Sequence, residues 1–128
     1  MNRLRTILGL VAGVMLVLSS VAHSVMGWSV MHGQLAATTA PADLVTGLGL
    51  GWRFGGVAML AMGIIVLDIF VARLRARPRS TFPAAVIGLV YLAFGVYAYA
   101  ADPNPFYIGV FIVPGVLLAV ASLQRDQS

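Results

Sequence analysis

Four long apolar stretches, separated by short polar or proline-containing segments, dominate the pattern along the chain. Each is about 18–22 residues long, the length that an α-helix needs to cross a bilayer, and none shows the strict alternation of a half-buried strand. We therefore predict an all-α integral membrane protein, a single four-transmembrane-helix bundle formed by residues 1–128. The expected spans are residues 6–27, 51–72, 82–101 and 105–123.

Proline and small polar residues mark several of the span ends. Pro78 should end the second span, because a proline interrupts the helical hydrogen-bond ladder. Ser80 or Thr81 is expected to cap the third span, and Asn104 the fourth. Pro114 lies in the middle of the fourth span, where it predicts a kink and a freed carbonyl.

A segment without lysine or arginine, residues 28–50, separates the first two spans. Trp28 and Trp52 flank it, as is typical of residues that anchor helix ends at a membrane interface. Pro41 and Asp43 suit the first turn of a helix. We expect an outer loop here, with a short interfacial helix lying on the membrane surface and leading into the second span.

The N-terminal stretch also resembles a secretory signal peptide. Arg3 and Arg5 precede an apolar run, and Ala22-His23-Ser24 matches a cleavage site with small residues on either side of the middle position. We expect the stretch to be retained as the first membrane span.

Composition supports the membrane assignment and excludes several function classes. The chain is 60% hydrophobic and only 9% charged, whereas soluble domains carry roughly 25% charged residues. Its net charge of +4 is the difference between eight arginines, with no lysine, and four acidic residues. These arginines stand at span ends, so we predict a lipid bilayer as the surrounding partner and no nucleic acid. Cysteine is absent, which excludes disulfides and thiolate chemistry.

The arginine distribution also predicts orientation, since positive residues favour the cytoplasmic side. Two arginines precede the first span, four lie between the second and third, and Arg125 follows the fourth. The other two connections hold none, apart from Arg53 at a span boundary. Both termini should be cytoplasmic and residues 28–50 external, as expected for a protein of a bacterial inner membrane.

Glycines at regular spacing predict close contacts between helices. Gly47, Gly51 and Gly55 repeat at every fourth position, so they lie in one row of the second span, where another helix could approach closely. Further packing positions are expected in the first span, at Gly9 and Gly13, and in the third, at Gly88 and Gly95.

His23 is the main candidate for cofactor binding. It shares a helix face with Ser20 and Ser24 and should lie opposite Gly55. A neutral imidazole there could ligate haem or a chlorin. Arg53 is expected to reach the interface as a snorkelling side chain, or alternatively to contact a headgroup, quinone or propionate. We favour a histidine that bonds a neighbouring carbonyl or hydroxyl, and therefore predict no bound cofactor.

Asp68 is the only acid within a predicted span. An intramembrane carboxylate is a candidate proton carrier. However, Asp68 lies near the cytoplasmic end, with Arg75 on the same face and Arg5 at similar depth, so we favour a structural ion pair. The chain has no glutamate, and its two histidines have no third ligand at metal spacing. This pattern argues against zinc and di-metal carboxylate sites.

These features lead to three hypotheses about function. The leading one is a non-catalytic accessory or structural subunit that binds other membrane protein subunits in a larger complex, for example of electron transport or photosynthesis. The second is a haem- or pigment-binding redox subunit that uses His23. The third is a small proton-coupled transporter that uses Asp68. No residue is assigned a catalytic role.

Overall fold

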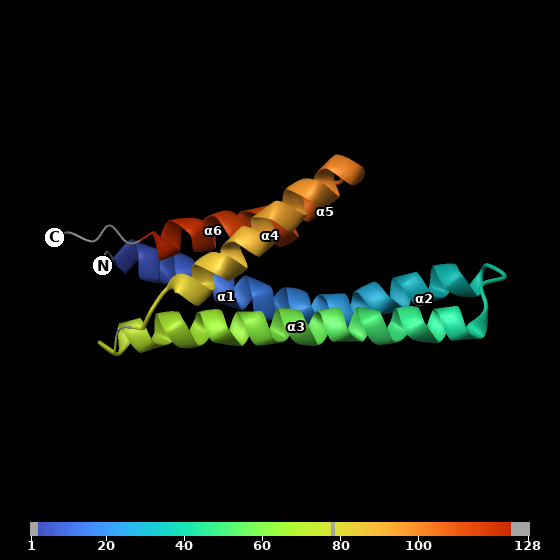
Figure 1. Ribbon diagram of the computed structural model, residues 1–128, viewed down its shortest axis with the longest axis horizontal. Helices are drawn as coiled ribbons and strands as arrows, with labels where there is room; N and C mark the ends of the chain where they lie inside the picture. Colours follow the sequence, from blue (N-terminus) through green and yellow to red (C-terminus); the bar gives the residue numbers. More distant parts are fainter. Residues whose placement is uncertain (1–2, 78, 124–128) are drawn as a thin grey trace.

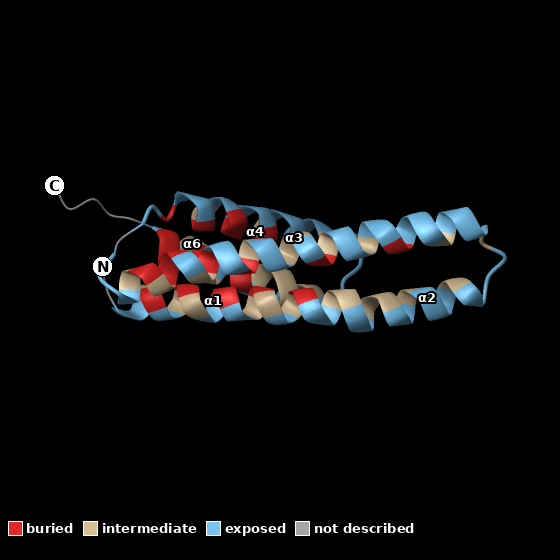
Figure 2. Cartoon of the chain, turned by 90° about the horizontal axis from the view of Figure 1, so that it is seen from below, coloured by how far each residue is buried: buried red, intermediate tan, exposed pale blue. Residues whose placement is uncertain are grey.

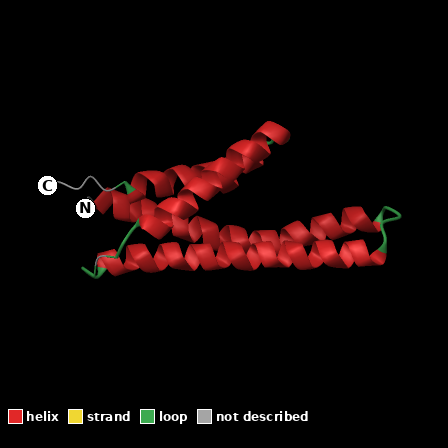
Figure 3. Cartoon of the chain, in the orientation of Figure 1, coloured by secondary structure: helices red, strands yellow, loops and turns green. Residues whose placement is uncertain are grey.

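The computed structural model describes residues 3–77 and 79–123, which form helices joined by short turns (Figure 3). Its four continuous helical stretches are each long and apolar enough to cross a membrane. Their bounds are Arg3–Ala36, Ala42–Leu74, Phe82–Ala101 and Pro105–Ser122. The predicted all-helical chain with four helices of membrane-spanning length is thus confirmed.

The first two stretches form a long antiparallel hairpin (Figure 1). The first consists of α1 (Arg3–Ala22), a π-helical turn η1 (His23–Gly27) and α2 (Trp28–Ala36), and the second is α3 (Ala42–Leu74). Only residues 37–41 connect them. The predicted loop over residues 28–50 is therefore mostly helical, which corrects that expectation, whereas the helix expected to begin at Pro41–Asp43 and lead into the second span is present as the start of α3. Most of that segment instead extends both helices.

The start of α3 shows why the segment is helical. Pro41 stands at the N-cap in an extended conformation, with ψ 144°, and Asp43 lies in the first turn, near the positive end of the helix dipole. No proline precedes Pro41 in the chain, so no proline ends the first helix before the connecting turn. Helices α2 and α3 remain in contact along this part of the hairpin, although no residue of α2 is buried.

The last two stretches form a second, shorter hairpin. It consists of α4 (Phe82–Ala101), α5 (Pro105–Tyr107), the π-helical turn η2 (Ile108–Ile112) and α6 (Val113–Ser122). Asn104 caps α5 as predicted, since its side-chain oxygen accepts the N–H of Phe106 at 3.0 Å. Ser80, rather than Thr81, accepts the N–H of Phe82 at 3.2 Å. The turn η2 ends two residues before Pro114, whose missing N–H disturbs the regular hydrogen-bond ladder of the preceding turn.

Helix α3 ends in a left-handed turn. Ala76 has a φ of 54°, and the N–H of Arg77 donates to the carbonyl of Ala72 at 2.9 Å. This pairing closes the helix end in the manner usually seen with glycine at the left-handed position. Helix α3 therefore ends at Leu74. The predicted stop at Pro78 concerns a position outside the described residues.

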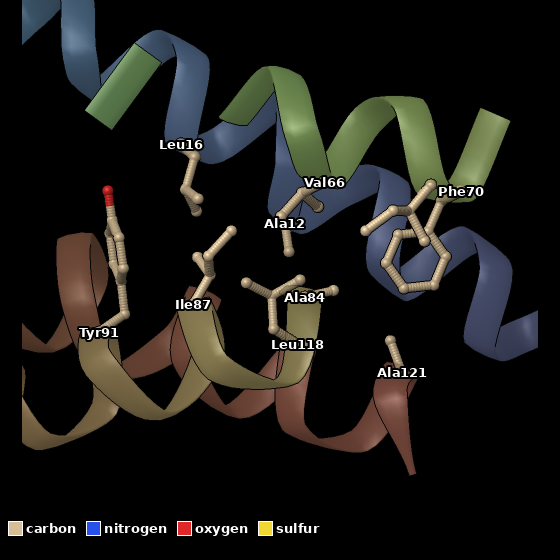
Figure 4. Packing of buried hydrophobic residues seen from close by; sticks show 10 residues of the cluster. Ala12, Leu16, Val66, Phe70, Ala84, Ile87, Tyr91, Leu118 and Ala121 are labelled. Atoms are coloured by element: carbon tan, nitrogen blue, oxygen red, sulfur yellow. The ribbon is translucent and has the colours of Figure 1, made fainter. Parts of the chain in front are cut away.

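The two hairpins pack together at the end where α1 begins and α6 ends, mainly through α1 and α6 (Figure 1). Buried residues gather at this end, whereas the far part of the first hairpin is largely exposed (Figure 2). The shared core contains side chains from α1, α3, α4 and α6 (Figure 4). Its members are Ala12, Leu16, Val66, Ile69, Phe70, Ala84, Ile87, Tyr91, Leu118 and Ala121. The other end of the first hairpin, around residues 37–41, is called the tip below.

Candidate functional site

A row of glycines on α3 forms the seam of the first hairpin. Gly49, Gly56 and Gly63 are spaced by seven residues, and a side chain at any of them would collide with the opposite helix. A Cβ on Gly49 would stand 2.7 Å from the ring of Trp28, and one on Gly63 would stand 2.8 Å from a methyl group of Val17. The helices approach this closely because these positions carry no side chain.

The predicted row on α3 lies elsewhere on the helix. A Cβ on Gly47 or Gly51 would meet no atom within 4 Å, and one on Gly55 would meet only the His23 Nε2, at 3.3 Å. Within the described chain, therefore, Gly47 and Gly51 pack against no helix. A contact of this row with a helix of another chain stays a prediction.

The other glycines singled out by their spacing do lie at contacts between helices. Gly9 meets the ring of Phe70, and a Cβ on Gly13 would stand 2.7 Å from the side chain of Leu67. In the second hairpin, a Cβ would stand 2.7 Å from Leu118 at Gly88, and 2.8 Å from Ile112 at Gly95. Small residues thus allow close approach in both hairpins.

A pair of reciprocal hydrogen bonds joins the two helices of the first hairpin at His23 and Trp52. The His23 Nε2–H donates to the carbonyl of Trp52 at 3.1 Å, and the Trp52 Nε1–H donates to the carbonyl of His23 at 2.7 Å. Their rings stack, with centroids 4.5 Å apart and planes within 1°. His23 is also the first residue of η1, and a π-helical turn leaves a backbone carbonyl out of the regular ladder. The carbonyl of His23, at the start of this turn, accepts the indole N–H of Trp52.

The pair of bonds between His23 and Trp52, called the junction below, shows what the His23 imidazole does in the fold. The prediction placed the imidazole opposite Gly55 and bonded to a neighbouring carbonyl or hydroxyl, and the structure places it against Gly55 with the Trp52 carbonyl as partner. To ligate an iron, Nε2 would have to give up that bond to the Trp52 carbonyl. The arrangement therefore favours hydrogen bonding over metal ligation.

Aromatic contacts extend the junction toward the tip. The ring of Trp28 lies 6.4 Å from that of Trp52 and 5.6 Å from that of His32. The guanidinium of Arg53 stands over the Trp28 ring at 5.8 Å, within the range of a cation–π contact. Arg53 is thus held beside the tryptophans, as a residue at a membrane interface would be.

An open groove runs along α3 on the face that α1 does not cover. It has a volume of about 630 Å³ and is lined by His23, Asp43, Leu44, Gly47, Leu48, Gly51, Trp52 and Gly55. These α3 residues recur at four-residue spacing, so the predicted glycine row forms part of the lining of the groove. The sequence indicated this glycine row but could not show that no other helix of the described chain covers it.

The charged groups at the opposite end of the first hairpin are tied to one another. Asp68 pairs with Arg79, not with the expected Arg75 or Arg5, and both side chains are more than half exposed. Arg5 donates to the carbonyl of Leu123, and Arg73 donates to that of Arg79 at 3.1 Å. Asp68 therefore has an exposed ion-pair environment rather than that of an acid enclosed in an apolar core.

The fold and the site define a class of protein: an all-helical chain of two antiparallel hairpins with four membrane-length helices. Within residues 3–77 and 79–123, no group of three or more side chains of the metal-ligating types comes together. Comparison with family models, with characterised proteins and with solved structures gave no match.

Proposed function

We propose that the chain is an integral membrane protein whose four helical stretches all span a bacterial inner membrane. The mean hydropathy of the most apolar part of each stretch is 1.9 to 2.3, yet only 28–33% of each such part is buried within the chain. Such extensive exposed apolar surface is costly in water but suits contact with lipid or with other membrane helices. The end at which α1 begins and α6 ends, with the arginine-containing α3–α4 connection, lies in the cytoplasm, and the tip lies outside.

Within the membrane, the chain acts as a non-catalytic accessory or structural subunit of a larger complex. The observation that carries this proposal is the open groove on α3. Its glycines, among them Gly51, let a partner's helix approach the backbone closely, and Leu44 and Leu48 supply apolar contacts beside them. Electron-transport and photosynthetic complexes, which contain small helical subunits, are the proposed hosts.

The polar groups of the groove support binding rather than catalysis. The His23 Nε2 is already bonded to the carbonyl of Trp52. Asp43 lies nine residues before Trp52, roughly 14 Å along the helix. An imidazole and a carboxylate separated in this way cannot exchange a proton with one reacting group.

Substitution of Gly51 by leucine tests the proposal. Because no atom of the chain lies within 4 Å of a Cβ at Gly51, Gly51→Leu should fill the groove without disturbing the hairpin. Tagged chain, extracted from native membranes in mild detergent, should lose its co-purifying membrane proteins at an unchanged melting temperature. Gly109→Leu is a matched control, since Gly109 is equally free of neighbours but lies in η2.

Two outcomes would contradict the accessory role. One is an unchanged set of co-purifying proteins in Gly51→Leu. The other is a wild-type chain that is recovered from native membranes as a solitary monomer, without any stoichiometric partner.

A further inference from the structure

Six arginines lie near the cytoplasmic end of the described chain, and the structure divides them into two groups. Three are engaged, because Arg5 bonds the carbonyl of Leu123, Arg79 pairs with Asp68, and Arg73 donates to the carbonyl of Arg79. The other three, Arg3, Arg75 and Arg77, are exposed, and their guanidinium groups make no hydrogen bond or ion pair with the described residues.

The three unengaged arginines lie at one level of the molecule. Helices α1 and α3 run antiparallel, and Gly9 of α1 meets Phe70 of α3. Six residues from this pair toward the end of the hairpin, the count reaches Arg3 on the first arm of the hairpin and Ala76, just beyond the end of α3 and between Arg75 and Arg77, on the second. The start of α1 and the end of α3 lie at the same end of the molecule (Figure 1).

The turn that carries Arg75 and Arg77 is fixed by its own backbone. The N–H of Arg75 donates to the carbonyl of Val71 at 3.2 Å, and the N–H of Arg77 donates to that of Ala72 at 2.9 Å. Both side chains therefore extend from a formed turn, which lowers the ordering cost of binding a ligand.

The chemistry of this group suits a phosphate. A guanidinium presents a planar fork of donors that matches two phosphate oxygens, which an ammonium does not. Asp68, the acid nearest in sequence, is already paired with Arg79. We propose that Arg3, Arg75 and Arg77 form a binding site for the phosphate of an anionic phospholipid of the cytoplasmic leaflet. This site rests on the membrane-spanning part of the proposed function.

Lipid retention tests the site directly. The full chain is reconstituted into nanodiscs of phosphatidylcholine with a minor share of phosphatidylglycerol and then extracted. Native mass spectrometry identifies the lipids that stay bound to it. Wild type should retain phosphatidylglycerol selectively. Because each arginine near an anionic surface contributes about fivefold in affinity, Arg75→Gln/Arg77→Gln should reduce this selectivity roughly 25-fold. Arg53→Gln, the same chemical change near the opposite interface, should leave it unchanged.

Each other outcome overturns the inference. Equal retention by wild type and the double variant removes the role of these arginines, and an equal loss in Arg53→Gln shows an effect of net charge alone. Release of the lipid by added inorganic phosphate assigns the site to a free anion. A chain that inserts normally but shows no lipid preference refutes only this site, whereas failure to enter nanodiscs refutes the membrane-spanning proposal as well.

Discussion

At the residue scale, the His23 side chain contributes to the fold through one hydrogen bond and one stacking contact, both to Trp52. His23→Ala removes both, and we expect it to reduce the free energy of unfolding by about 1–3 kcal/mol. The melting temperature, followed by tryptophan fluorescence in detergent, measures this loss. His32→Ala is the control, because His32 is exposed and has only a tilted ring contact with Trp28.

The same pair of variants separates the structural role of His23 from a role in cofactor binding. We expect the purified wild-type chain to show no absorption band in the visible range. A band that is present in wild type, persists in His32→Ala and disappears in His23→Ala would overturn the structural interpretation and establish His23 as a ligand.

Tyr91 provides a second prediction at this scale. It is only 4% exposed, and its hydroxyl has no hydrogen-bond partner among the described residues. A buried hydroxyl without a partner is destabilising, so Tyr91→Phe should leave stability unchanged or raise it by about 1–3 kcal/mol. Tyr97→Phe, at a position that is 69% exposed, should have no effect on the melting temperature. A clear loss of stability in Tyr91→Phe would instead reveal a bound water, lipid or subunit at the hydroxyl.

At the scale of single helices, the two glycine rows of α3 should respond in opposite ways to a larger side chain. A Cβ added at Gly63 would stand 3.0 Å from the backbone nitrogen of Val17 and 2.8 Å from its methyl group, whereas one added at Gly47 would meet no atom within 4 Å. Gly63→Leu should therefore separate α1 from α3 and cost about 1–3 kcal/mol or more. Gly47→Leu should leave the melting temperature unchanged. Equal stability of the two variants would contradict the observed seam.

The sequence predicted some helices well because local signals mark their ends. Helix α4 has the expected bounds of 82–101, and Asn104 caps the following helix. The segment 28–50 was misjudged because helices that include it are longer than a bilayer needs, which led to the expectation of a loop. Its apolar residues and the late position of Pro41 nevertheless allow both helices to continue.

The candidate site was harder to predict than the helices. Apolar residues cover every side of a membrane-length helix, so hydropathy does not show which glycine row of α3 meets α1. The row at Gly47 and the row at Gly49 are both permitted by helical periodicity. The bonds between His23 and Trp52 join positions 29 residues apart, and no local pattern encodes such a pairing. The partner of Asp68 was misassigned for a related reason, since Arg79 reaches it from beyond the helix end.

At the scale of the whole molecule, the orientation in the membrane can be tested directly, because the chain contains no cysteine. Single cysteines at Thr38, in the connecting turn at the tip, and at Ala76, after α3, should react with a membrane-impermeant maleimide from opposite sides. Thr38→Cys should be labelled in intact cells, and Ala76→Cys only after the membrane is opened. Labelling of both in intact cells would refute the assignment of the termini to the cytoplasm.

The unequal length of the two hairpins has a mechanical consequence. Helix α3 has 33 residues and α4 has 20, so the first hairpin is roughly 50 Å long and the second roughly 30 Å. Beyond the shared core, the two arms of the first hairpin are held by the glycine seam and by the bonds between His23 and Trp52, and they therefore move as one stiff rod. The tip lies roughly 36 Å from Val66 of the core, so a rotation of about 5° at the core would displace the tip by roughly 3 Å. Small changes in helix packing at the shared core would therefore become movements of roughly 3 Å at the tip.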